Sequence, residues 1–165
     1  WTDGSERSGV ASEASFHHVI AIPEETYPMD DCIFCKIIAG DIPSECVLST
    51  EAAFAFMDIG PLAAGHCLLI PRSHYETVDQ MPAEEAAAVL GELPALVKAV
   101  QTATGCKGVN VLQNNGRVAN QLVPHVHFHI IPRNPNDAWS FNWPAGEYTG
   151  DHMAELGDAI RKALS

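Results

Sequence analysis

Three histidines alternate with apolar residues in Pro124-His125-Val126-His127-Phe128-His129-Ile130-Ile131-Pro132. Side chains on a β-strand point to opposite faces in turn, so a strand here would place His125, His127 and His129 on one face. Neighbouring histidines on that face would lie about 6.5–7 Å apart. Three imidazoles could then converge on one polyanionic ligand, or one could serve a metal while its neighbour performs chemistry.

Histidine has an ordinary pKa near neutrality, so this pattern favours nucleophilic or acid–base chemistry. The alternative is a half-buried strand whose polar residues simply face water. A single histidine would fit that alternative. Three histidines in register, backed by β-branched and aromatic residues, favour a functional site.

Composition limits the class of protein. The chain has 165 residues, of which 47% are hydrophobic and 18% charged, as expected for one domain with a real core. No apolar run approaches the roughly 20 residues of a membrane-spanning helix, so no membrane partner is expected. The formal charge of −12 argues against a nucleic-acid partner but not against a nucleotide. Five cysteines without a secretory signal predict a reducing compartment, cytoplasmic or also nuclear, and no secretion.

The chain divides into an extension at 1–30, expected to be flexible, and a single domain at 31–165. His17-His18 in the extension is a candidate ligand pair or simply solvated chain. Strands are predicted at 46–49, 53–57, 66–70 and 109–112, besides the histidine strand. Helices are predicted at 32–39, at 82–104 with a kink at Pro94, and at 153–164. Because the strands cluster rather than alternate with helices, the pattern predicts an α+β fold with an antiparallel sheet.

The histidine motif resembles the signature of the histidine-triad (HIT) nucleotide hydrolases. Further matches to that family are Cys32-Ile33-Phe34-Cys35-Lys36-Ile37-Ile38, Asp58-Ile59, Gly65-His66-Cys67-Leu68-Leu69-Ile70-Pro71-Arg72-Ser73-His74, Asn114-Asn115-Gly116 and Trp143-Pro144. The resemblance runs from about residue 31 to the C-terminus and is greatest to the adenosine 5′-monophosphoramidase (Hint) branch. It implies a HIT-like fold, with a five-stranded antiparallel sheet, one long helix and short helices, and a homodimer.

The resemblance also implies an activity, the hydrolysis of purine nucleoside phosphoramidates through a covalent nucleotidyl-histidine intermediate, without an organic cofactor. Two alternatives remain open: a dinucleoside polyphosphate hydrolase, and a non-catalytic adaptor that binds zinc or a nucleotide. The implied catalytic residues are His127 as nucleophile, with His129, His66 and His125 in support. The implied nucleotide-binding residues are Ile33, Phe34, Ile37, Phe56, Asp58, Ile59, Asn114, Gln121 and Leu122.

Two positions, Asn120 and Leu122, depart from the family pattern. The family often carries Gly-Gln-Ser/Thr-Val ahead of the histidines, whereas this chain has Asn120-Gln121-Leu122-Val123. Leu122 offers no hydroxyl to a phosphate or leaving group, although its backbone N–H still can donate. The departure therefore concerns leaving-group preference and rate rather than the nucleophile.

The Cys32-x-x-Cys35 spacing lets two thiolates reach one metal ion. Some members of the family that this chain resembles bind structural zinc through this cysteine pair and two histidines. One histidine follows the Ile-Pro-Arg segment, and the other is the first triad histidine. His74 and His125 occupy those places. The implied site is a closed Cys₂His₂ zinc centre that leaves His127 free.

Overall fold

The computed structural model describes residues 31–138 and 144–165. The elements are α1 (Ile33–Ala39), β1 (Cys46–Ser49), β2 (Ala53–Met57), β3 (Cys67–Pro71), the 3₁₀ turn η2 (Val78–Gln80), α2 (Ala83–Gly91), α3 (Leu93–Thr104), β4 (Gly108–Gln113), the 3₁₀ turn η3 (Arg117–Ala119), β5 (Phe128–Arg133) and α4 (His152–Leu164). The predicted extension, including His17-His18, lies outside the described residues, as does Trp143. None of the helices in the described ranges is long and apolar enough to cross a membrane.

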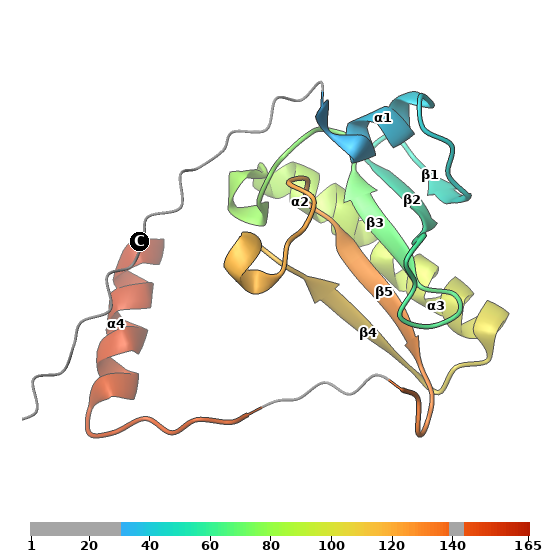
Figure 1. Cartoon of the computed structure of the whole chain (residues 1–165). Helices are drawn as coiled ribbons and strands as arrows, with labels where there is room; N and C mark the ends of the chain where they lie inside the picture. The colour runs from blue at the N-terminus through green and yellow to red at the C-terminus, as the bar shows by residue number, and fades with distance from the viewer. Residues whose placement is uncertain (1–30, 139–143) are drawn as a thin grey trace, which may run out of the picture.

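The five strands form one antiparallel sheet in the order β1-β2-β3-β5-β4 (Figure 1). The register aligns Phe56, Leu68 and His129 in one row across β2, β3 and β5. Directly opposed residues on neighbouring strands point to the same face. His129 therefore shares a face with Phe56 and Leu68, and this is the face that α1 covers. The predicted α+β class and five-stranded antiparallel sheet are confirmed.

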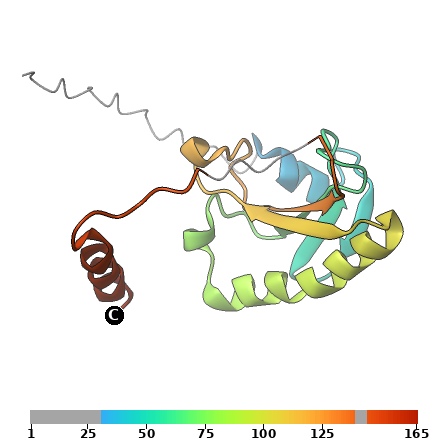
Figure 2. The same ribbon diagram turned by 90° about the horizontal axis from the view of Figure 1, so that it is seen from below.

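The opposite face of the sheet is covered by α2 and α3, which run end to end beneath it (Figure 2). They make up the predicted long helix, interrupted at Glu92. Pro94 explains the break, because proline has no N–H to donate and its ring clashes with the carbonyl four residues earlier. At the start of α3 the proline occupies a position where its missing N–H costs little.

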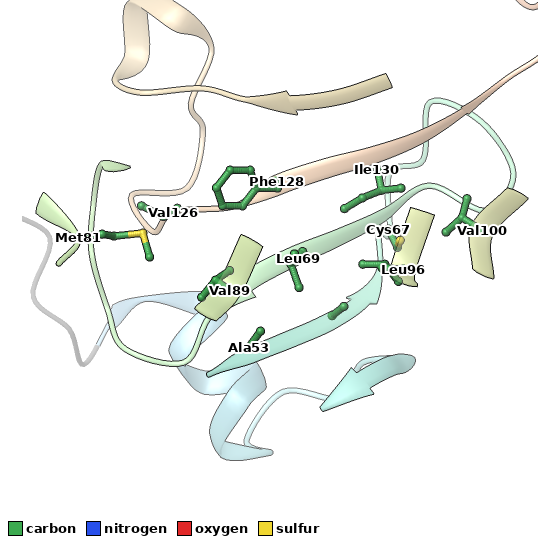
Figure 3. Packing of buried hydrophobic residues seen from close by; sticks show 11 residues of the cluster. Ala53, Cys67, Leu69, Met81, Val89, Leu96, Val100, Val126, Phe128 and Ile130 are labelled. Carbon is green, nitrogen blue, oxygen red and sulfur yellow. The ribbon is translucent and has the colours of Figure 1, made fainter. Parts of the chain in front are cut away.

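The main core lies between the sheet and these two helices (Figure 3). The helices contribute Val89, Leu96 and Val100 to it, and the central strands contribute Leu69 and Ile130. A second, smaller cluster of Cys32, Phe34, Phe56, Leu68 and Ile70 fills the space beneath α1. β5 contributes Phe128 and Ile130 to the main core on one face and His129 to the α1 side on the other.

The strand predicted to carry all three histidines is shorter than expected, and this is a correction. β5 begins at Phe128, so only His129 belongs to it, while His125 and His127 lie in the extended segment before it. The backbone N–H groups of this segment bond outside the sheet: His125 N–H donates to the Val123 carbonyl, and Val126 N–H donates to the Tyr75 carbonyl. The three imidazoles consequently do not converge on a single point.

Two further helices, α1 and α4, complete the described structure. α1 ends at Gly40, whose left-handed backbone (φ 86°) accommodates the capping turn. α4 lies apart from the sheet (Figure 1) and has no buried residue. The predicted C-terminal helix is therefore present, and the sites described below are built without it.

Candidate active site and metal site

A pocket of about 630 Å³ opens on the α1 side of the sheet. Its walls come from α1, the loop between α1 and β1, the end of β2, and the segment that leads into β5. Most of the lining is apolar, with polar groups concentrated where His127 and His129 enter it. The lining residues are Ile33, Phe34, Ile37, Ile42, Pro43, Ser44, Glu45, Phe56, Met57, Asp58, Ile59, Leu68, Asn120, Leu122, Val123, His127 and His129.

His127 is 5% exposed and is fixed by a single backbone contact. Its Nδ1 lies 2.7 Å from the carbonyl oxygen of His125. A carbonyl oxygen can only accept, so Nδ1 carries the proton and donates, and Nε2 is left with a free lone pair. Burial lowers the pKa of His127 below its ordinary value, opposed by this hydrogen bond and by the charge of Asp58. The ring of Phe34 packs edge-on against it at 5.3 Å. His127 is therefore neutral, with its proton on Nδ1 and the Nε2 lone pair available for nucleophilic attack.

The tautomers of His66 and His129 follow from one backbone donor. Leu62 N–H donates to His66 Nδ1 at 3.1 Å, so the proton of neutral His66 resides on Nε2. That Nε2–H lies 3.0 Å from His129 Nδ1, which must accept it. His129 therefore keeps its own proton on Nε2. Burial, together with the nearby His127 and His66, lowers the pKa of His129 to about 4. At neutral pH His129 is an uncharged N–H donor in the pocket wall.

Asp58 is anchored at the end of β2. One carboxylate oxygen accepts from Gly60 N–H at 2.8 Å, and the other lies 3.5 Å from His66 Nε2. Asp58, His66 and His129 bring three donor atoms within 4.8 Å, close enough for a cation. However, the Leu62 contact places a proton on the His66 nitrogen that a metal would need. The arrangement is therefore a hydrogen-bonded chain from Leu62 through His66 to His129, and not a favourable metal site.

A second cluster consists of Cys32, Cys35, His74 and His125. Cys32 Sγ and Cys35 Sγ lie 3.5 Å and 3.6 Å from His125 Nδ1, and Cys35 Sγ lies 3.4 Å from His74 Nδ1. In a tetrahedral site with Zn–S of about 2.3 Å and Zn–N of about 2.0–2.1 Å, sulfur and nitrogen are separated by about 3.6 Å. The spacing of the donors matches that of a zinc centre.

The protonation of this cluster also fits a metal. His125 Nε2–H donates to the Pro71 carbonyl at 3.0 Å, so the lone pair of Nδ1 faces the thiols. Burial lowers the pKa of His125 to about 4, which keeps it neutral. Burial raises the pKa of the Cys35 thiol to about 11, and the hydrogen bond and charge of Cys32 add to the shift. A cation between the sulfurs would offset that cost.

The structure places most of the predicted nucleotide-binding residues in the pocket wall. Ile33, Phe34, Ile37, Phe56, Asp58, Ile59 and Leu122 line it. His66 is outside the lining and contacts His129, whereas His125 faces the thiols.

Two of the predicted nucleotide-binding residues, Asn114 and Gln121, lie outside the pocket lining. Asn114 is absent from the lining, and the buried amide of Gln121 is fully engaged elsewhere. Its Oε1 accepts from Gly116 N–H, and its Nε2 donates to the carbonyls of Glu76 and Val123. The Gln121 side chain therefore links the loop before β5 to the segment at Glu76. Residues 42–45 line the pocket but were not predicted to, because Asp41-Ile42-Pro43 indicated only a turn.

Comparison with known proteins decides the family. The model of the HIT domain matches residues 39–136, well over half of the chain. The chain belongs to the HIT family. An adenosine 5′-monophosphoramidase of Schizosaccharomyces pombe, hnt1, is 44% identical over 81% of this chain and 98% of its own length.

Solved HIT structures agree in fold. A HIT family protein from Bacillus subtilis superposes with a TM-score of 0.78 at 38% identity, covering 82% of this chain and 98% of that one. A zinc-bound histidine triad protein from Mycobacterium smegmatis superposes with a TM-score of 0.64 at 27% identity, covering 84% and 100%. The fold is therefore that of a HIT protein.

Proposed function

We propose that the pocket hydrolyses purine nucleoside 5′-phosphoramidates, such as adenosine 5′-monophosphoramidate, to the nucleoside monophosphate and an amine. The observation that carries the proposal is the free Nε2 lone pair of His127 in the lining of a mainly apolar pocket. The apolar walls suit the faces of a purine, and the Asp58 carboxylate suits the two hydroxyls of a ribose. The similarity to a protein named adenosine 5′-monophosphoramidase supports this choice of substrate.

The reaction has two displacements. In the first, His127 Nε2 attacks phosphorus, the P–N bond to the amine breaks, and the amine leaves with one proton taken up from solvent. In the second, water attacks phosphorus, the bond to His127 breaks, and one proton returns to solvent. Because His129 carries its proton on Nε2, it can donate a hydrogen bond to the phosphoryl oxygens as charge develops. The His125 carbonyl holds the His127 proton throughout.

The test is substitution of the nucleophile. His127→Ala should reduce turnover of adenosine 5′-monophosphoramidate by at least about 10³-fold, because no covalent intermediate can form. AMP binding, measured by calorimetry, should persist. His152→Ala, a histidine exposed on α4, is the matched control and should behave as wild type. Turnover by His127→Ala would contradict the nucleophile assignment.

Trapping of a labelled nucleotidyl-enzyme in a single turnover separates an enzyme from a non-catalytic adaptor. An adduct on the wild type that is absent from His127→Ala supports the proposal. Binding of AMP without any adduct or product would favour the adaptor. Faster cleavage of a diadenosine polyphosphate than of the phosphoramidate would favour the dinucleoside polyphosphate alternative.

We also propose that the Cys32, Cys35, His74 and His125 cluster holds a structural zinc ion. The donor spacing, the neutral His125 lone pair and the similarity to a zinc-bound relative support this. His74 Nδ1, 3.4 Å from Cys35 Sγ, would supply the fourth ligand. When bound, zinc would tie α1, the loop after β3 and the segment before β5 together. Metal analysis of the purified protein should give about one zinc per chain.

We further propose a homodimer located in the cytoplasm. β4 is an edge of the sheet and carries the partly exposed Val111, which a second subunit could cover. All five cysteines are free thiols, as expected in a reducing compartment. Light scattering coupled to size exclusion tests the dimer, and imaging of the tagged protein in its own cell tests the location.

A further inference from the structure

The buried position of His127 determines where the leaving amine must lie. His127 is 5% exposed and lines the pocket, so its Nε2 attacks a bound phosphate from the buried side. In phosphoryl transfer the attacking and leaving atoms are roughly in line on opposite sides of phosphorus. An amine displaced by His127 Nε2 therefore departs toward the mouth of the pocket. The side chains that contact it must belong to the lining and be exposed to solvent.

Leu122 meets both conditions. It lines the same pocket as His127, yet it is 86% exposed. Ile59, next to Asp58, is a second fully exposed apolar residue in the same lining. Single exposed apolar residues are common, but exposed apolar residues in the wall of a substrate pocket indicate a contact with ligand.

The Leu122 backbone is held in place by its neighbour. The Gln121 side chain makes three hydrogen bonds, to Gly116, Glu76 and Val123, and so fixes the chain immediately before and after Leu122. Asn120 on the other side of Gln121 is in the left-handed conformation (φ 65°), which completes a tight turn. The loop thus presents an apolar side chain to solvent from a fixed backbone, which lowers the entropic cost of binding a ligand against it.

We propose that Leu122 forms an apolar subsite for the leaving amine, so that the enzyme prefers phosphoramidates whose amine carries an alkyl chain. This rests on the proposed phosphoramidate hydrolysis and specifies its substrate class. Amines that are short, or that bear a charged group close to nitrogen, gain nothing from the contact. The subsite acts on specificity, while the chemical step remains with His127.

A series of adenosine 5′-phosphoramidates of methylamine, n-butylamine and n-hexylamine tests this, because n-alkylamines have nearly equal basicity and differ mainly in apolar area. A fully buried methylene is worth about 0.8 kcal/mol, or about fourfold, so a half-covered one should give about twofold. In the wild type, kcat/KM should rise about twofold per added methylene. In Leu122→Ser and Leu122→Ala the rise should fall below about 1.3-fold. Val118→Ser is the matched control, since Val118 is also highly exposed (98%) but is not among the pocket-lining residues, and it should keep the wild-type rise.

The outcomes separate this inference from the proposed function. Hydrolysis of all three substrates with no dependence on chain length, or an equal dependence in wild type and Leu122→Ser, overturns the subsite and leaves the hydrolase standing. If none is hydrolysed, the proposed function fails, and calorimetric affinities of the same compounds test the subsite directly. A chain-length dependence of affinity that Leu122→Ser abolishes would then still support it, and its absence would overturn it.

Discussion

Gln121 is predicted to stabilise the fold and not to bind the nucleotide. Its buried amide makes three hydrogen bonds to backbone groups of Gly116, Glu76 and Val123. At roughly 1 kcal/mol each, their loss in Gln121→Ala should lower the free energy of unfolding by about 3 kcal/mol. For a chain of this size that corresponds to a fall in Tm of about 6–12 °C. Gln121→Glu should also destabilise, because its carboxylate oxygen faces two carbonyls that need donors.

The assay is urea unfolding followed by circular dichroism, with AMP affinity measured on the folded protein by calorimetry. Gln101→Ala on the exposed face of α3 is the control and should change stability by less than about 0.5 kcal/mol. Well below the unfolding transition, Gln121→Ala should bind AMP within about threefold of wild type. A variant with wild-type stability but a tenfold loss of AMP affinity would refute the structural role and restore the nucleotide contact.

Three further predictions concern the supports of the site. Gly65→Ala should destabilise by at least about 1–2 kcal/mol in urea unfolding, because Gly65 has φ +91° and an added Cβ would meet Thr104 Cγ2; an unchanged midpoint would contradict this. Cys32→Ser should lower bound zinc below about a tenth of an equivalent and abolish the sensitivity of Tm to chelator, measured by metal analysis and calorimetry. Burial lowers the pKa of His129 from 6.5 to about 4, so the unfolded chain takes up the proton first and stability is lost as the pH falls from about 6.5 toward 4. The stability difference between wild type and His129→Asn should shrink over that window, and a constant difference would contradict the assignment.

Much of the fold could be predicted from local sequence signals. The strands at 46–49 and 53–57 agree with the structure residue for residue, because apolar runs bounded by turn residues determine them. Pro94 correctly predicted an irregularity in the long helix, since its effect is local to the backbone.

The site was harder to predict because its geometry depends on distant contacts. Alternation placed all three histidines on one strand, but a hydrogen bond from Val126 to Tyr75, 51 positions earlier in the numbering, takes the first two off the sheet. The placement of the Gln121 side chain likewise depends on Glu76, far away in sequence. Residues 42–45 carry only turn signals, and their place in the pocket wall follows from the position of α1 over the sheet. Motif order identified the chemistry, whereas the partners of each side chain required the three-dimensional structure.

The proton on the His127 ring is positioned by a peptide carbonyl, that of His125, and not by another side chain. No substitution can delete a carbonyl oxygen, so the correct tautomer is protected from point mutation in a way that an aspartate or glutamate partner would not be. The same residue's ring is tied to Pro71 and faces the two thiols, which fixes the orientation of that peptide group. The position of the His127 proton can therefore be changed by shifting the main chain at His125. Substitutions at Cys32 or Cys35, which contact the His125 ring but do not line the pocket, are one way to do so.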